Sequence, residues 1–337
     1  MVLHGDDLLQ IRVGAEVGHA DVGSCQGVGH LLERALPGGV ENLTLTGTGS
    51  INATGNDFRT IFRGNDADNV IVDTQGGNDQ FYGNGGNDTL IGGLGHEWFD
   101  GGAGVDRMEG GGGSDNYVVD DVGDVVVEGA DAGRDTVQTT ITYTLGANVE
   151  DLVLEDGAGD IDGTGNELDN YVLGNEGSNV LSGLGGNDTL YGNGGNDTID
   201  GGEGDDSVYG GAGNDIIFGG AGNDRLTDTE GTNTLSGGAG DDVYVVESSV
   251  GYTITENADE GIDQVRSLAS VTLAANVENA VLENLSGFNL VAPANATGNA
   301  LADFMLGYAQ RAQLTNVLVV NQRLWSTSFF VHDDWRA

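Results

Sequence analysis

Two runs of this chain place aspartates nine residues apart, or twice nine where another residue intervenes. Each aspartate lies two positions before an apolar or aromatic residue and follows several glycines. The ten are Asp79, Asp88, Asp106 and Asp115 in the first run, and Asp188, Asp197, Asp206, Asp215, Asp224 and Asp242 in the second. Carboxylates are ligands for hard cations such as Ca²⁺ and Mg²⁺. The pattern therefore indicates metal binding.

The repeating unit reads Gly-Gly-x-Gly-x-Asp-x-(apolar)-x. It holds without a slip from Gly165 to Val245 and, in an earlier run, from Thr74 to Val118, with two weaker units at 55–63 and 64–72. The sixth position departs from aspartate at Glu97 in the first run and at Asn170, Asn179 and Asn233 in the second.

The charge balance supports a bound cation. The chain has 54 acidic and 11 basic residues, a net charge of −43. Nucleic acids and anionic membranes recruit basic patches, so both are poor partners for this chain. Such self-repulsion and a glycine count of 61 predict disorder unless a cation is bound. Cys25 is the single cysteine, so no intramolecular disulfide can replace the ion.

A longer repeat encloses the nonapeptides. The segment 117–154 returns as 244–282 with one inserted residue, and a truncated copy begins at Leu36. Each copy leads toward a Thr-Gly-Asn sequence. The chain is therefore a tandem array of modules, each a spacer followed by nonapeptides, and internal repetition of this kind predicts a solenoid.

The nonapeptide resembles the calcium-binding repeat of the RTX (repeats-in-toxin) family. The spacers are similar to those of multi-module secreted RTX proteins and to the R-modules of mannuronan C-5-epimerases. The resemblance implies an all-β, right-handed parallel β-roll in which two nonapeptides, each with one strand, complete one coil. It also implies type I secretion from a Gram-negative bacterium.

In such a roll, residues 18 apart stack about 4.8 Å from one another. Asp188, Asp206, Asp224 and Asp242 would then lie along one edge, and Asp197 and Asp215 along the other. Stacked carboxylates repel, and calcium reverses that repulsion because it accepts about 6–8 oxygen ligands. We expect several Ca²⁺ ions between coils, with turn carbonyls as further ligands; the candidate glycines are Gly202, Gly204, Gly211, Gly213, Gly220 and Gly222. Stacked pairs in which asparagine replaces aspartate should bind calcium more weakly. Glu97 puts calcium binding at the pairs Asp79/Glu97 and Glu97/Asp115 in doubt.

Other chemistry is not indicated. His96-Glu97-Trp98-Phe99-Asp100 lacks the second histidine of a zincin motif, and neither Gly-x-Ser-x-Gly nor the epimerase sequence Asp-Pro-His-Glu occurs. We therefore predict no enzyme. Tyr191 and Tyr209 should stack on an outward strand face, with Phe218 on the opposite face, either for stability or as a small sugar-binding platform.

These patterns divide the chain into four segments. Residues 1–35 are unassigned, as non-native or disordered sequence. Residues 36–163 form the first module, with nonapeptides at 55–118, and residues 164–300 form the second, with nonapeptides at 165–245. Residues 301–337 are an atypical tail, read as a cap, a secretion signal or out-of-frame sequence.

The favoured function is a calcium-binding module of a secreted bacterial protein, extracellular and monomeric, that folds on calcium after export. The alternatives are an accessory, substrate-positioning module of a polysaccharide-modifying enzyme and a spacer in an adhesin. A polysaccharide is thus a candidate partner besides calcium. No run of 18 apolar residues occurs and "MVLHGDDLLQ" lacks a basic segment before an apolar one, so we expect no membrane insertion and no Sec-type signal peptide.

Overall fold

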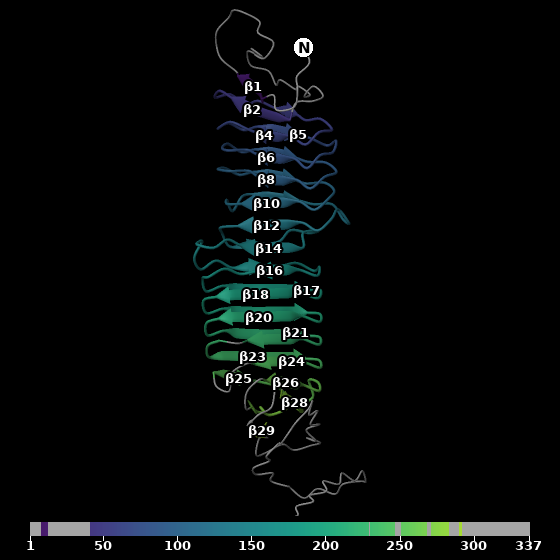
Figure 1. Cartoon of the computed structure of the whole chain (residues 1–337), viewed down its shortest axis with the longest axis vertical. Coiled ribbons are helices and arrows are strands. Elements are labelled where there is room, and N and C mark those ends of the chain that lie inside the picture. Colours follow the sequence, from purple (N-terminus) through teal and green to yellow (C-terminus); the bar gives the residue numbers. More distant parts are fainter. Residues whose placement is uncertain are drawn as a thin grey trace, which may run out of the picture.

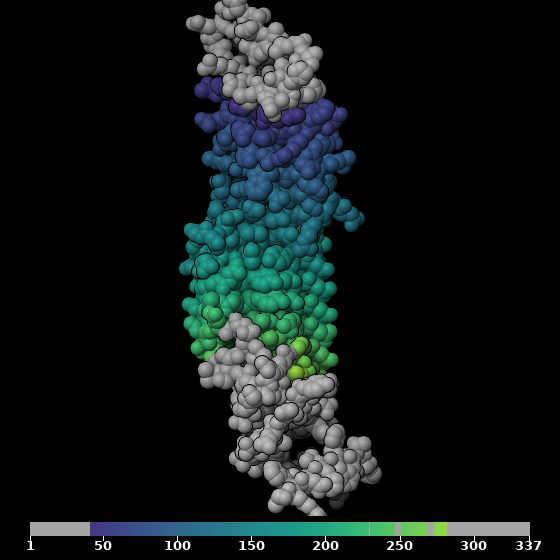
Figure 2. Space-filling view, in the orientation of Figure 1, coloured from purple at the N-terminus to yellow at the C-terminus, as the bar shows by residue number. Residues whose placement is uncertain are grey.

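The computed structural model describes residues 8–12, 41–228, 230–246, 251–267, 271–282 and 290–291. Within these residues every element is a β-strand and every pairing between neighbouring strands is parallel. The strands run across the long axis of a rod and stack along it, coil after coil (Figure 1). Colour changes steadily along the rod, so neighbours in space are successive coils of the chain (Figure 2).

One face of the rod is a 15-stranded sheet made, apart from β1, of the even-numbered strands. Its strands are β1 (Leu8–Arg12), β2 (Asn42–Thr46), β4 (Ile61–Arg63), β6 (Gln80–Tyr82), β8 (Trp98–Asp100), β10 (Asn116–Val119), β12 (Thr136–Thr139), β14 (Asp151–Leu154), β16 (Tyr171–Leu173), β18 (Thr189–Gly194), β20 (Ser207–Ala212), β22 (Arg225–Asp228), β24 (Val243–Val246), β26 (Gln264–Ser267) and β28 (Asn279–Leu282).

The odd-numbered strands form the remaining, shorter sheets. Five strands serve the first run: β3 (Ala53–Thr54), β5 (Val70–Val72), β7 (Thr89–Ile91), β9 (Arg107–Glu109) and β11 (Val125–Val127). Seven serve the second: β13 (Tyr143–Thr144), β15 (Gly163–Thr164), β17 (Val180–Gly185), β19 (Thr198–Glu203), β21 (Ile216–Ala221), β23 (Asn233–Ala239) and β25 (Tyr252–Ile254). A separate pair joins β27 (Val271–Thr272) and β29 (Leu290–Val291).

Each coil of the repeats holds two nonapeptides. Leu190 pairs with Val208, Val208 with Leu226, and Leu226 with Tyr244. Each of these partners is the eighth residue of its own unit, and one further unit lies between the two. The expected all-β parallel β-roll is therefore confirmed.

The apolar residue at the eighth position of each repeat fills the core. Successive side chains alternate across a strand, so this residue faces inward while its neighbours face outward. Phe62, Phe81, Phe99 and Tyr117 are fully buried and stack as a column, with ring centroids 4.9, 4.7 and 5.1 Å apart. Each such side chain contributes roughly 1.5–3 kcal/mol by leaving water.

The spacer continues the rod. In the long sheet Tyr117 pairs with Val137, Val137 with Leu152, and Leu152 with Val172. Hydrogen bonds join the same coils, from Asp115 to Asp135, from Asp135 to Glu150 and from Glu150 to Asn170. Successive coils of the spacer therefore hold 20, 15 and 20 residues. The sheet of odd-numbered strands is interrupted here, between β11 and β13. The two runs thus belong to one solenoid joined by coils of irregular length.

The ends of the chain are described only in part. Leu8–Arg12, within the segment left unassigned, forms β1 and pairs in parallel with β2. The rest of 1–35, together with Cys25 and the tail 301–337, lies outside the described residues. Among the described residues, no helix is long and apolar enough to cross a membrane.

Candidate metal centres

The glycine-rich half of each repeat makes the turn that carries the aspartate. The six candidate glycines all have backbone angles in the left-handed region, which side chains disfavour. Their φ values are +114° at Gly202, +126° at Gly204, +103° at Gly211, +151° at Gly213, +117° at Gly220 and +138° at Gly222. Glycine is therefore favoured at these turns by conformation, apart from any role in binding, although Leu184 and Asn193, which pair with Gly202 and Gly211, also have positive φ.

The turns bring the aspartates into register along the rod. All ten are at most 2 % exposed. In each, Oδ1 accepts a hydrogen bond from the backbone amide of the residue stacked one coil earlier, as from Asp188 N to Asp206 Oδ1 at 2.7 Å and from Asp206 N to Asp224 Oδ1 at 2.8 Å. The same bond joins Asp88 to Asp106 in the first run and Asp197 to Asp215 on the other edge. The expected stacks are thus present, tied by a carboxylate-to-amide ladder.

The second oxygen of each carboxylate is left without a donor. Oδ2 of all ten aspartates is buried and makes no hydrogen bond within the described part of the chain. A buried carboxylate oxygen without a partner is costly, and such groups in native proteins point to an unsatisfied requirement such as an ion. Here the requirement recurs every nine residues.

At several levels a backbone oxygen faces the same space as the orphaned carboxylate oxygen. A methyl group placed on Gly201 would overlap both Asp206 Oδ2 and the carbonyl oxygen of Gly219. The corresponding substitution at Gly219 would overlap Asp224 Oδ2 and the Gly237 carbonyl. Carboxylate and carbonyl oxygens therefore converge where glycine leaves room, and this donor set fits Ca²⁺.

Where asparagine occupies the sixth position, its side-chain NH₂ group hydrogen-bonds to a backbone carbonyl. The Asn179 side-chain amide donates to the Ile161 carbonyl at 2.5 Å, and that of Asn69 to the Ile51 carbonyl at 2.9 Å. At these positions the asparagine NH₂ group therefore contacts the carbonyl oxygen directly, without an ion. Weaker calcium binding at the asparagine levels stays a prediction.

The carboxylates are held in an environment that disfavours their charge. Burial raises the pKa of Asp188 to about 7, and repulsion from Asp206 adds to the effect. Burial likewise raises the pKa of Asp224 to about 7, with a further contribution from Asp242. A divalent cation between the stacked groups would replace their repulsion by attraction to the ion and so offset the cost of burying their charge.

Glu97 occupies an aspartate position in the first run. Its amide donates to Asp115 Oδ1 at 2.7 Å, so the backbone ladder continues through it. Both of its carboxylate oxygens are buried and have no hydrogen-bond partner among the described residues, and burial raises its pKa. The neighbouring His96 is exposed and accepts a hydrogen bond from Ser114 N, as befits a turn residue.

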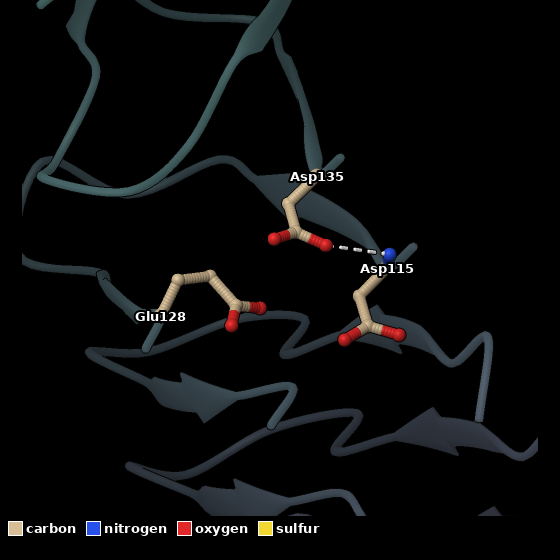
Figure 3. A group of neighbouring side chains, drawn as sticks. All are labelled: Asp115, Glu128 and Asp135. Carbon is tan, nitrogen blue, oxygen red and sulfur yellow. Dashed lines mark hydrogen bonds between the residues drawn. The ribbon is translucent and has the colours of Figure 1, made fainter. Parts of the chain in front are cut away.

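A cluster of three acids lies where the first run meets the spacer. One carboxylate oxygen from each of Asp115, Glu128 and Asp135 lies within 4.8 Å of the other two (Figure 3). Among the described residues it is the one group of three acidic, histidine or cysteine side chains found this close together. Glu128 and Asp135 were not predicted, because they lie in the spacer beyond the nonapeptide pattern.

Comparison with known families decides the nature of the repeats. The family model described as the RTX calcium-binding nonapeptide repeat (4 copies) matches the chain six times, at residues 63–96, 82–117, 91–126, 164–199, 191–226 and 218–246. These are the two runs of stacked aspartates. They are RTX calcium-binding repeats.

The RTX matches end at residues 126 and 246, and leave out most of the spacer. A search of curated proteins found no significant match to the chain. The two RTX runs therefore carry the assignment, while the spacer is understood from its own geometry.

Proposed function

We propose that this chain is a calcium-binding β-roll module of a secreted bacterial protein, with a structural rather than catalytic role, that folds when calcium binds. The observation that supports this most directly is the register of ten buried aspartates, each with one orphaned oxygen. Sites formed only by stacked coils exist only in the folded state, so the free energy of binding stabilises the fold. Extracellular modules bind calcium with dissociation constants of roughly 10⁻⁴–10⁻³ M, which would keep the chain unfolded in the cytosol and fold it outside.

Circular dichroism during calcium titration tests the proposal. The β signal should appear cooperatively and disappear on adding a chelator. Magnesium should reproduce it poorly, because Mg²⁺ requires a smaller octahedral site and retains its water. A spectrum independent of calcium would reject the folding switch.

A second candidate function, an accessory polysaccharide-binding module, is favoured by one feature of the surface. The Tyr191 and Tyr209 rings stack as expected, with centroids 4.5 Å apart and planes 5° apart, and Tyr171 joins them at 5.5 Å. Because these rings cover one another's faces, a sugar would contact the outward edges of the row. Oligosaccharide binding that is lost in Tyr191→Ala but kept in Phe218→Ala, on the opposite sheet, would support it. If the wild type binds no oligosaccharide, the remaining alternative to the calcium-binding module is a spacer in an adhesin.

A further inference from the structure

The three acids at the end of the first run come from two different parts of the module. Asp115 is the last sixth-position aspartate of the run, Glu128 follows β11, and Asp135 precedes β12. Only Asp115 lies within the residues matched by the repeat family, whose match ends at residue 126. The cluster thus joins the repeats to the spacer.

The cluster contains buried oxygens with no donor. Asp115, Glu128 and Asp135 are 1, 8 and 0 % exposed. Asp135 Oδ1 accepts from the Asp115 amide at 2.8 Å and Glu128 Oε1 accepts from the Tyr117 hydroxyl, but Oδ2 of Asp115 and Oδ2 of Asp135 have no partner within the described residues. The carboxylates face one another across a small space (Figure 3).

Glycine leaves the room for this convergence. A methyl group placed on Gly110 would overlap Asp115 Oδ2, Glu128 Oε1 and the Tyr117 hydroxyl at once. Three oxygens from three different side chains therefore surround one point above the Gly110 backbone. At the repeat levels around Gly201 and Gly219, by contrast, one aspartate oxygen and one carbonyl oxygen meet, and at Gly210 the carboxylates of Asp215 and Asp228 meet.

The second module repeats part of the arrangement, although its three acids do not all come within 4.8 Å of one another. Its equivalents are Asp242, Glu256 and Asp263, and the Asp242 amide donates to Asp263 Oδ1 at 3.0 Å. Asp242 Oδ2 and Glu256 Oε2 are again buried, with no hydrogen-bond partner in the part of the chain that the structure describes. One residue is inserted before Glu256, yet its Oε1 still reaches the amide of Gly237, the counterpart of Gly110, at 2.9 Å.

We propose that Asp115, Glu128 and Asp135 form a divalent-cation site of calcium size, additional to those of the repeats. Three carboxylates supply an all-oxygen donor set with a charge of −3, which suits a hard cation. The ion would bind the spacer to the last repeat and so fix the turn between Glu128 and Asp135. The proposal extends the calcium-binding function to residues outside the repeats.

The number of calcium ions bound at saturation, measured by equilibrium dialysis, tests the site. Glu128→Gln keeps an oxygen for the Tyr117 hydroxyl but removes the charge, and it should bind one ion fewer than the wild type. Glu155→Gln, at an exposed position in the spacer, should bind the same number as the wild type. An unchanged count in Glu128→Gln overturns this inference alone, whereas a wild-type chain that binds no calcium overturns the proposed function as well.

A second measurement does not depend on the charge variant folding. Terbium bound to the wild type should emit on excitation of tyrosine, in part through Tyr117. Tyr117→Phe keeps all three carboxylates and the ring, and should lower this emission, while Tyr143→Phe in the spacer should leave it unchanged. Equal emission from the wild type and Tyr117→Phe overturns the site.

Discussion

Asp206 should respond to substitution in opposite directions with and without calcium. It is buried, its Oδ2 has no donor, and it stacks between Asp188 and Asp224. Burial raises its pKa to about 6 from 3.8. Without metal at pH 7.5, its ionised form therefore costs the folded state about 3 kcal/mol, at about 1.4 kcal/mol for each pKa unit. Asp206→Asn avoids that cost and should stabilise the calcium-free fold.

With calcium the same change should destabilise the fold. Removing one partner of a buried ion pair costs about 3–5 kcal/mol, and Asp206 would face ions on both sides, for a loss of about 6–10 kcal/mol. Subtracting the roughly 3 kcal/mol gained leaves a net loss of at least ~3 kcal/mol.

The assay is urea unfolding followed by circular dichroism, in chelator with enough osmolyte to populate the fold and in saturating calcium. Asp205→Asn is the matched control: Asp205 is the exposed neighbour, and an amide oxygen can still accept from Asn223 N as its carboxylate does at 2.7 Å. It should change stability little in either condition. An Asp206→Asn effect of the same sign in both conditions would refute the ion-mediated account.

The remaining predictions concern packing and protonation. Gly219→Ala should destabilise the calcium-bound fold by about 1–3 kcal/mol in thermal unfolding, because its Cβ would overlap Asp224 Oδ2, whereas Gly76→Ala has open space and should be neutral. Phe81→Ala should cost about 3–5 kcal/mol in urea unfolding with calcium, since its ring lies within the buried column, while Phe58→Ala, 46 % exposed, should cost under ~1 kcal/mol. In chelator, the β signal should rise as pH falls from 8 to 5. Burial raises the folded-state pKa values of carboxylates such as Asp88 and Asp197 to about 7, so near neutral pH the folded state binds more protons than the unfolded state. The stability of the fold is therefore lost as pH rises through 7. A flat pH profile would contradict those pKa values.

The period of the sequence was sufficient to predict the repeats. A spacing of nine with glycines before aspartate predicts the turn and the inward apolar residue, while the resemblance to the RTX β-roll implies the coil of two strands that stacks the aspartates. The core column from Phe62 to Tyr117 and the Asp188–Asp242 ladder follow from it directly. The 18-residue register was predicted from that resemblance rather than from the period alone.

The spacer could not be predicted in the same way. Its coils differ in length and have no fixed period, so nothing local places Glu128 above Gly110 or Asp135 beside Asp115. One signal was available: the two acids recur at Glu256 and Asp263 in the second copy of the spacer. The carbonyls of Gly219 and Gly237 were likewise missed, because the sequence does not show which turn oxygen faces the carboxylate.

The direction of the strands governs how the rod would respond to tension. Hydrogen bonds between coils run along the rod axis, so a pull on its two ends loads one coil at a time rather than a whole sheet in shear. Each coil of two nonapeptides occupies about 4.8 Å of the rod but extends to roughly 60 Å when released. Under tension the chain would therefore lengthen in steps, one coil at a time.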